Sequence, residues 1–404
     1  MPASQADLPR LDYLDPALRG DRFHEVMLDL ARRSWLAAWD LGYFVLDREA
    51  AAFFLRTDKA AFPGVKILGL VGITEGPLYD SLSTNIISLT GEQHRRLRRL
   101  VQPAFTPKAA DRYRPAMRRF LRELYGEVAT AGRCDFVQAF AKPYPAQMIA
   151  TVLGAPLEDA ERLHRLSGLL QAQFDALALA TRREELERAA LEFDEYAERL
   201  VAERRERPGD DLVSALVAAA GEGERLSHEE CVRLVRDVLN GGVDTTQGQL
   251  AHGVRLLATH PEQRRLLAED PSLAPRATEE VLRFEPVAPF TTRVLLEDLS
   301  YRGVVFPAGT VMGICAFTAN RDAGAEPNPE RFDITADRGP AKPLTFGAGP
   351  HFCLGANLAR AELAEGLAFL AAHLEDLELD GDAAYGTITG IYGVESLPIR
   401  FRPA

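Results

Sequence analysis

Residues 346–360, FGAGPHFCLGANLAR, are the stretch that decides how the rest of the chain is interpreted. Three glycines and one cysteine, Cys353, precede a segment rich in helix-forming residues, ANLARAELAEGLAFLAAHL. The glycines allow the backbone to take positive φ values or to pass close to a flat object. This arrangement predicts a tight loop that presents one thiol at the start of a helix.

The position of Cys353 favours metal binding. A cysteine at a loop–helix junction lies near unpaired backbone N–H groups and the positive end of the helix dipole, which favour its thiolate. Without a CxxC partner, it supplies one coordination position and not a zinc cage. A lone cysteine is most often an ordinary buried thiol, but that interpretation leaves the glycine spacing unexplained.

The pattern FGxGxHxCxG followed by LAR resembles the haem-ligand loop of the cytochrome P-450 superfamily, in its soluble bacterial form. The residues that match the pattern are Phe346, Gly347, Gly349, His351, Cys353 and Gly355. The resemblance implies haem b with Cys353 as the iron ligand, and cofactor contacts from Phe346, Gly347, His351 and Gly355.

The resemblance also implies a mainly α fold with small β-sheets, shaped as a triangular prism. It predicts a single domain over 1–404 with the haem-ligand loop at 346–355. Helices are expected over about 90–285 and 355–375, and strands over about 40–60, 290–315 and 376–404. In detail, residues 22–41 are predicted as a helix and YFVLD, 43–47, as a strand.

Composition agrees with a globular protein of this size. The 404 residues are 47% hydrophobic and 26% charged, and no Pro/Gly/Ser-rich linker or internal repeat divides them. The net charge of −12 argues against nucleic-acid binding. Four cysteines without paired spacing predict a reducing cytoplasm, and an N-terminus without an apolar run predicts no membrane segment. A monomer is expected.

Residues 227–260 predict one long helix with an unusual middle. Ser227 and Glu230 form a capping-box start, whereas the central NGGVDTT contains poor helix formers. A close helix crossing at the glycines is one interpretation. The resemblance to the family's (A/G)Gx(D/E)T stretch implies another. Gly241 and Gly242 would give room over the haem, Thr245 would contact dioxygen, and Asp244 would relay protons.

The segment TGEQHRRLRRL, 90–100, predicts a basic helix with Thr90 and Gln93 as a capping box. His94 and Arg98 share one face. A solvated basic helix is the usual interpretation, but the resemblance implies that His94 and Arg98 bind haem propionates. The outward arginines would then dock a ferredoxin- or flavodoxin-type protein that delivers electrons from NAD(P)H.

Further motifs of the family follow in order. Glu280 and Arg283 resemble its ExxR pair, and NPERFD nominates Arg331 as the third member, all three with a structural role. By the same resemblance, Arg293 and His351 bind propionates. Taken alone, Arg293 could be a surface arginine and His351 an ordinary loop histidine.

A substrate pocket is expected among apolar segments that lack clear periodicity, chiefly 61–90 and about 165–190. The walls predicted for it are apolar: Ile67, Leu70, Val71, Ile73, Leu170, Phe174, Val287, Phe290 and Ile391. The substrate is therefore expected to be a hydrophobic small molecule of terpenoid, steroid, polyketide or aromatic type.

The sequence thus predicts a haem-thiolate monooxygenase that uses O2 and a separate redox partner. Two alternatives remain open at this point. One is a peroxide-driven peroxygenase of the same fold, against which the Asp244–Thr245 pair argues. The other is a haem-thiolate sensor or carrier without catalytic activity.

Overall fold

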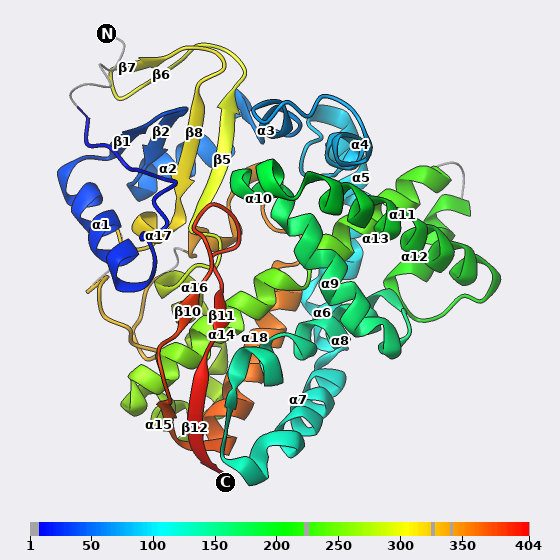
Figure 1. Ribbon diagram of the computed structural model, residues 1–404, viewed down its shortest axis with the longest axis vertical. Coiled ribbons are helices and arrows are strands. Elements are labelled where there is room, and N and C mark those ends of the chain that lie inside the picture. The colour runs from blue at the N-terminus through cyan, green and yellow to red at the C-terminus, as the bar shows by residue number, and fades with distance from the viewer. Residues whose placement is uncertain (1–7, 222–225, 325–327, 340–341, 404) are drawn as a thin grey trace.

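The computed structural model describes residues 8–221, 226–324, 328–339 and 342–403 (Figure 1). The first seven residues, where the sequence predicts no signal peptide or anchor, lie outside this part. The described helices are α1 (Gly20–Arg33), α2 (Arg48–Arg56), α3 (Lys66–Gly69), α4 (Pro77–Thr84), α5 (Gly91–Val101), α6 (Pro107–Asp111), α7 (Arg114–Val128), α8 (Pro143–Leu153), α9 (Ala160–Gln171), α10 (Ala176–Thr181), α11 (Arg183–Glu206), α12 (Leu212–Gly221), α13 (His228–Gly241), α14 (Asp244–Thr259), α15 (Pro261–Glu269), α16 (Ala274–Phe284), α17 (Ala316–Ala319) and α18 (Ala356–His373).

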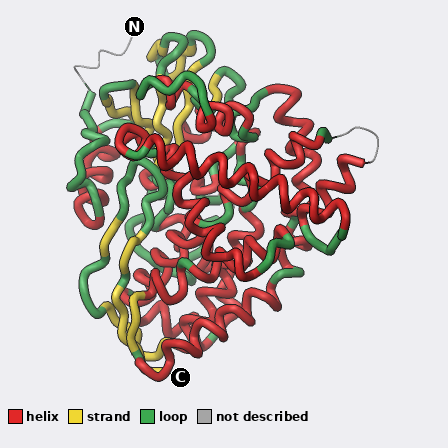
Figure 2. Tube along the Cα trace, turned by 45° about the vertical axis from the view of Figure 1, so that its right-hand side comes forward, coloured by secondary structure: helices red, strands yellow, loops and turns green. Residues whose placement is uncertain are grey.

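The strands form small sheets at the margins of the helical mass (Figure 2). A five-stranded sheet has the order β1-β2-β8-β5-β3, and a three-stranded sheet has the order β4-β12-β9. The pairs β6–β7 and β10–β11 complete the set. The strand bounds are β1 (Leu36–Trp39), β2 (Gly42–Val45), β3 (Ala60–Ala61), β4 (Arg133–Asp135), β5 (Phe290–Leu295), β6 (Leu299–Tyr301), β7 (Val304–Phe306), β8 (Val311–Cys315), β9 (Leu374–Leu379), β10 (Ala384–Tyr385), β11 (Val394–Ser396) and β12 (Pro398–Pro403).

The predicted fold class, mainly α with small sheets, is confirmed. The helix predicted over 22–41 is too long, because α1 ends at Arg33 and Leu36–Trp39 forms β1. That strand pairs antiparallel with β2 across a tight turn, with Leu36 opposite Val45 and Trp39 opposite Gly42. A short apolar run such as LAAW fits a helix or a buried strand equally well, and tertiary pairing decides between them.

Two predicted helix starts have different outcomes. At α13, the Ser227 side chain accepts from the Glu230 N–H and the Glu230 side chain accepts from the Ser227 N–H, which confirms the capping box. At α5, Thr90 is the N-cap but makes no side-chain capping bond, so that capping box is wrong.

The core positions two helices at the centre of the molecule. The largest apolar cluster joins α7, α8, α9, α11, α13, α14, α16 and α18. Within it α18 packs against α7, α14, α15 and α16, and Figure 1 shows α14 and α18 running through the middle of the fold. The loop before α18 and the break before α14 are therefore both held by interior packing. Among the described residues, none of the helices has the length and apolar character needed to span a membrane.

Candidate functional site

The loop that carries Cys353 is closed by its own backbone. The Cys353 N–H donates to the Phe346 carbonyl at 2.9 Å. Gly347 and Gly349 have φ values of +69° and +71°, which favour glycine. A Cβ on Gly349 would also lie 2.7 Å from the carbonyl oxygen of Leu55. The glycine spacing thus permits the turn and its close approach to α2.

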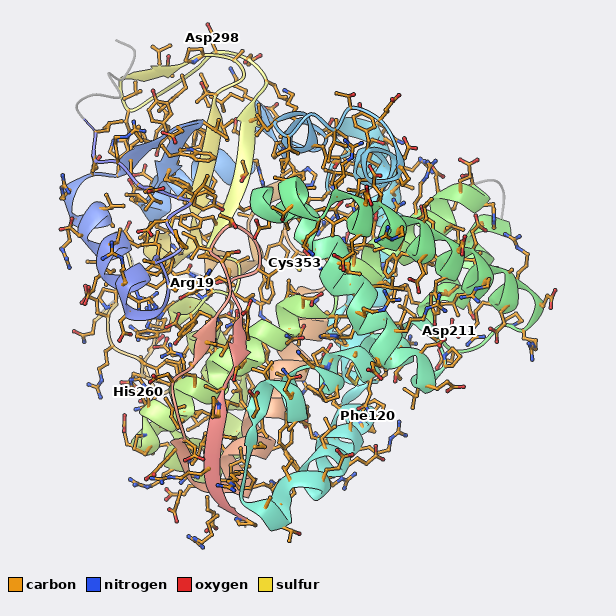
Figure 3. The ribbon with its side chains drawn as sticks, viewed as in Figure 1. Arg19, Phe120, Asp211, His260, Asp298 and Cys353 are labelled. Atoms are coloured by element: carbon orange, nitrogen blue, oxygen red, sulfur yellow. The ribbon has the colours of Figure 1, made fainter. Side chains whose placement is uncertain are left out.

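The thiol of Cys353 combines accessibility with an interior setting near the middle of the molecule (Figure 3). Burial raises its pKa, while the N–H groups of Gly355 and Ala356 and the charges of Arg98 and Arg360 lower it. The N–H groups at the helix start therefore favour the thiolate as expected, and desolvation opposes them. Cys353 is thus an accessible residue in desolvating surroundings.

Gly355 leaves the space beside its own Cα free of protein atoms. It caps α18 with φ −79°, so any residue could adopt its backbone conformation. A Cβ at this position would have no atom within 4 Å. The loop therefore presents the sulfur without a neighbouring side chain at Gly355, as a flat ligand lying against the backbone requires.

Four predicted site residues form one cluster: His94, Arg98, Arg293 and His351. It is called the cationic cluster here for the charges of its two arginines. The rings of His94 and His351 lie 4.3 Å apart. Burial lowers the pKa of His351 to about 4, with help from the charges of His94, Arg293 and Arg98. Burial likewise lowers the pKa of His94, and the arginines near it add to the effect.

Arg293 is the most deeply placed member of this cationic cluster. Arg293 is only 4% exposed, and this burial lowers the pKa of its guanidinium to about 10. It donates to its neighbour Thr292 O at 2.9 Å, and Arg98 donates to Phe352 O. In the described part of the chain, no carboxylate pairs with Arg98 or Arg293. Buried cations require an anionic partner, so the cationic cluster fits a ligand that carries carboxylates, as haem does.

The predicted central helix is interrupted. Gly242 and Val243 separate α13 from α14, with φ/ψ of −98°/−9° and −105°/−71°. The Thr245 hydroxyl donates to the Gly241 carbonyl at 3.0 Å, which satisfies an acceptor near the break. The widening predicted from NGGVDTT is thus a break of the helix.

The two glycines at this break differ. A Cβ on Gly241 would meet nothing within 4 Å, so Gly241 leaves open space. A Cβ on Gly242 would lie 2.7 Å from Ile149 Cδ1 on α8. The prediction that both glycines give room over a cofactor is therefore wrong for Gly242, whose small size allows α8 to approach.

Asp244 turns toward α9. Its Oδ2 accepts from the Ser167 hydroxyl at 2.6 Å. Burial raises its pKa, and the Ser167 hydrogen bond and the charge of His164 oppose that rise. The sequence did not predict Ser167, although the small pair Ser167–Gly168 inside an otherwise apolar stripe was a usable signal.

The third residue that joins Glu280 and Arg283 is Arg338 and not the predicted Arg331. Arg283 Nε and Nη2 lie 2.8 Å from the two oxygens of Glu280. Arg338 Nη2 lies 2.7 Å from Glu280 Oε1. The side chain of Arg331 is 68% exposed and faces Asp333 at 3.7 Å, so the prediction of Arg331 is wrong. Arg331 contributes its carbonyl oxygen, which accepts from both Arg283 and Arg338.

Some of the predicted pocket residues converge on α14. A Cβ on Gly248 would lie 2.6 Å from Val287 and 3.8 Å from Ile391, so these two side chains meet at one point of the helix. Phe290 instead packs in an aromatic cluster, with its ring centroid 4.9 Å from that of Phe44 and 5.4 Å from that of Tyr13.

Three other predicted pocket residues are either fully buried or exposed, and none of them lies at a partly covered wall. Ile73 and Leu170 are each 1% exposed within the helical core, so neither has surface left for a ligand. Leu70 is 63% exposed, unlike the covered wall that was predicted. These three assignments are wrong because an apolar stripe or run does not distinguish core, wall and surface.

Three partly buried predictions remain at the edge of the core. Ile67, Val71 and Phe174 pack against it without being enclosed. Phe174 lies edge-on to Phe62 with ring centroids 6.0 Å apart. The predicted covering segments 61–90 and 165–190 are therefore in contact.

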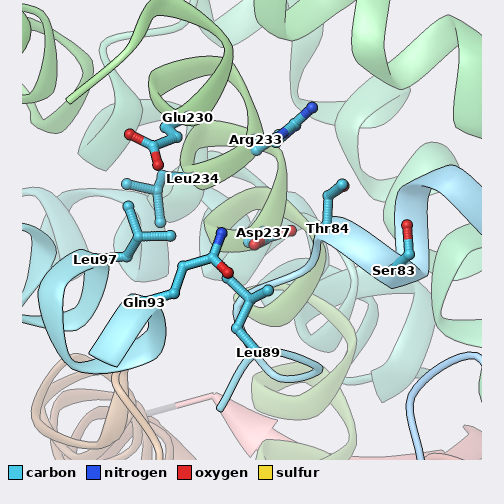
Figure 4. Close-up of a pocket in the computed structure, with 9 residues that line it drawn as sticks. All are labelled: Ser83, Thr84, Leu89, Gln93, Leu97, Glu230, Arg233, Leu234 and Asp237. Atoms are coloured by element: carbon cyan, nitrogen blue, oxygen red, sulfur yellow. The ribbon is translucent and has the colours of Figure 1, made fainter. Parts of the chain in front are cut away.

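A separate cavity of about 180 Å³ lies among α4, α5 and α13 (Figure 4). Its lining includes Gln93, Glu230 and Asp237, and none of the predicted site residues. Burial raises the pKa of Asp237 to about 6, while its Oδ2 accepts from the Ile86 N–H at 2.8 Å. Its other oxygen is inaccessible and lies 3.6 Å from Arg236 Nε. This cavity is distinct from the Cys353 site.

Comparison with known proteins gives a consistent result. The family model described as Cytochrome P450 matches residues 70–380. Luteothin monooxygenase of Streptomyces thioluteus is 38% identical over 99% of this chain and 98% of its own length. Mycinamicin IV hydroxylase/epoxidase of Micromonospora griseorubida is 39% identical over 73% of each chain.

Solved structures agree with these relatives. The crystal structure of CalO2 matches with a TM-score of 0.89 and 30% identity, covering 98% of this chain and 100% of its own. Epothilone D-bound cytochrome P450epoK matches with a TM-score of 0.89 and 25% identity, covering 98% of this chain and 99% of its own. The chain belongs to the cytochrome P450 family and is a monooxygenase.

Proposed function

We propose that this chain is a haem-thiolate monooxygenase in which Cys353 binds the iron of haem b. His94, Arg98, Arg293 and His351 would hold the haem propionates, and Gly241 and Gly355 would leave room for the two faces of the ring. Phe346 and Gly347 would shape the loop that presents the thiolate. The bound group supplies the activation of O2, and a thiolate ligand favours cleavage of the O–O bond.

The observation that carries this proposal is the cationic cluster without carboxylate partners, close to an accessible Cys353. The test is the absorption spectrum of the purified protein after dithionite reduction and exposure to carbon monoxide. A strongly red-shifted Soret band is expected for a thiolate opposite the ligand. A band at the imidazole position would contradict thiolate ligation, and no Soret band after reconstitution would contradict haem binding.

Asp244 and Thr245 would manage protons. The buried Asp244 has a raised pKa, so it can hold a proton nearer to neutral pH than an exposed aspartate can. Thr245, whose hydroxyl donates to Gly241 O, lies next to the open side of the helix break. Thr245→Ala is expected to increase peroxide release per O2 consumed, and unchanged coupling would contradict this role.

Electrons would come from NAD(P)H through a separate ferredoxin- or flavodoxin-type protein. Residues 91–128 contain ten Lys and Arg residues and four Asp and Glu residues. Some of these arginines pair with carboxylates, such as Arg118 with Glu365. The remaining excess of basic residues in an acidic protein would attract an acidic partner and steer its approach. Turnover with NAD(P)H should then depend on the added partner and weaken with salt, whereas turnover on peroxide alone would indicate a peroxygenase.

The proposed substrate is a hydrophobic secondary metabolite of polyketide type. Val287 and Ile391 place apolar side chains together beside Gly248 of α14, and named relatives include a 6-deoxyerythronolide B hydroxylase, 32% identical over 92% of this chain. Binding should shift the haem spin state in a titration. Preferential shifts with charged, water-soluble compounds would contradict this class.

We also propose that the protein works as a cytoplasmic monomer. The lack of paired cysteine spacing supports a reducing compartment such as the cytoplasm. Size-exclusion chromatography with light scattering should give the mass of one chain, 44.4 kDa. A stable dimer at low protein concentration would contradict it.

A further inference from the structure

One face of α9 is polar and lies against the break between α13 and α14. His164, Ser167, Gly168 and Gln171 follow the spacing i, i+3, i+4 and i+7, so they share one side of this helix. A Cβ on Gly168 would lie only 3.4 Å from Asp244 Oδ1, so the glycine lets α9 approach the acid.

The two ends of this face also meet the break. His164 Nε2 lies 2.7 Å from Gln247 Oε1 on α14. Gln171 Nε2 donates to the Asn240 carbonyl at 2.8 Å. Gln171 on α9 therefore binds the Asn240 carbonyl, which an uninterrupted helix would satisfy by itself.

Ser167 has two acceptors within reach. Its hydroxyl oxygen lies 2.6 Å from Asp244 Oδ2 and 3.2 Å from the Asn240 carbonyl. A hydroxyl carries one hydrogen, so it can donate to only one of them at a time. The residue is fully buried, so water does not replace either contact.

Each protonation state of Asp244 has a complete arrangement. When the carboxyl is ionised it only accepts, and Ser167 donates to it. When the carboxyl carries a proton, its O–H can donate to Ser167 Oγ while Ser167 donates to Asn240 O. The change needs one proton from solvent and a rotation of the hydroxyl, and no other bond forms or breaks.

We propose that Ser167 is a positioning residue that holds the Asp244 carboxyl in place in both protonation states by turning its hydroxyl between Asp244 and Asn240. The proposal rests on the proton-handling role proposed for Asp244. It adds the residue that keeps this acid oriented while its charge changes.

The charges around Asp244 define how its titration should respond. Burial raises its pKa, and the Ser167 hydrogen bond, His164 on α9 and Lys142 before α8 lower it. Removing the Ser167 hydroxyl costs the ionised carboxylate a charge-assisted hydrogen bond and the protonated carboxyl only a weaker neutral one, so Ser167→Ala should raise the pKa of Asp244 further.

The first test needs no turnover. For an acid whose pKa is higher in the folded than in the unfolded state, stability falls as pH rises between the two values. Ser167→Ala extends that fall to higher pH, so the Tm difference from the unmodified holoenzyme should widen as pH rises. A Tm difference that stays constant with pH would overturn the proposal.

Matched variants separate this effect from lost packing. With Asp244→Asn in the background, Ser167→Ala should give a Tm difference that does not change with pH. Ser167→Cys is close in size to serine but has a weak donor. The pH dependence of its Tm should lie between those of Ser167→Ala and the unmodified protein. Ser214→Ala removes a buried hydroxyl that accepts from Gly209 N at 2.8 Å, and its Tm difference should not vary with pH. If Ser214→Ala shows the same pH dependence, the proposal is overturned.

A second readout links Ser167 to the reaction. Peroxide released per O2 consumed, measured against pH with NAD(P)H and a ferredoxin system, should rise several-fold in Ser167→Ala, with its pH profile moved upward. A widening Tm difference with an unchanged peroxide profile would retain the positioning contact and overturn the proton role of Asp244. Failure of both readouts would overturn the positioning role itself.

Discussion

Arg338 Nη2 lies 2.7 Å from Glu280 Oε1, although Arg338 comes seven residues after the arginine nominated by the NPERFD motif. Glu280 is 3% exposed and also binds Arg283. Arg338→Ala leaves a buried carboxylate with one cation, and we expect it to cost about 3 kcal/mol of unfolding free energy, the low end for a broken buried pair.

Arg331→Ala is the matched control for that loss. Its exposed side chain lies 3.7 Å from Asp333, and exposed pairs contribute about 0–1 kcal/mol. Urea unfolding of both variants measures the difference. A larger cost for Arg331→Ala than for Arg338→Ala would contradict the assignment of the third member.

The sequence was most informative where spacing within a short motif determines geometry. The tight loop around Cys353 and the single helix that carries His94 and Arg98 could be predicted because glycine positions and helical spacing act locally. Arg338 could not, since it meets Glu280 58 residues away and lies in a segment without a distinctive pattern. The small pair Ser167–Gly168 marks a polar site in an apolar stripe, but it does not identify Asp244 as the partner, 77 residues away. Leu170 shows the limit of periodicity, because an apolar stripe predicts burial but does not specify what covers it.

The helix break provides a second prediction. Gly242→Ala places a Cβ 2.7 Å from Ile149 Cδ1. We expect a loss of about 1–3 kcal/mol from overpacking, measured as a lower Tm. The double variant Gly242→Ala with Ile149→Val should recover part of this loss, because it removes the methyl group that clashes.

Gly241→Ala is the comparison at the adjacent position. Its Cβ meets no protein atom within 4 Å, so Tm of the haem-free protein should stay close to that of the unmodified chain. The added methyl should instead alter the haem spectrum. Equal Tm losses for Gly241→Ala and Gly242→Ala would contradict the different roles of the two glycines.

The lowered pKa of His351 leads us to expect that the haem-free protein loses stability in acid. Burial and nearby cations lower its pKa from 6.5 to about 4. Between these values the unfolded chain binds the proton and the folded chain does not, so stability falls as pH decreases from about 6.5 to about 4. The loss should reach up to about 3 kcal/mol.

His351→Asn should reduce this acid sensitivity in chemical unfolding at several pH values. His373→Asn is a control at a partly buried histidine that bonds to Phe369 O at 2.8 Å. Bound haem should also reduce the effect of His351, because anionic propionates favour its charged form. Identical pH dependence of His351→Asn and the unmodified haem-free protein would contradict the buried neutral state.

Substitution of Arg293 should have opposite effects on folding and on cofactor binding. In the haem-free protein it is a buried cation with no carboxylate partner in the described part of the chain. Arg293→Met removes that unpaired charge while keeping an apolar stem of similar length, so the haem-free protein should become more stable by about 1 kcal/mol or more. Haem transfer to apomyoglobin should become faster in the same variant, because a propionate loses its cation.

The control is Arg10→Met, at an exposed arginine paired with Asp40, which should change neither the stability of the haem-free protein nor the rate of haem transfer by much. A variant at Arg293 that weakens folding and leaves haem transfer unchanged would show that this arginine stabilises the fold without binding the cofactor.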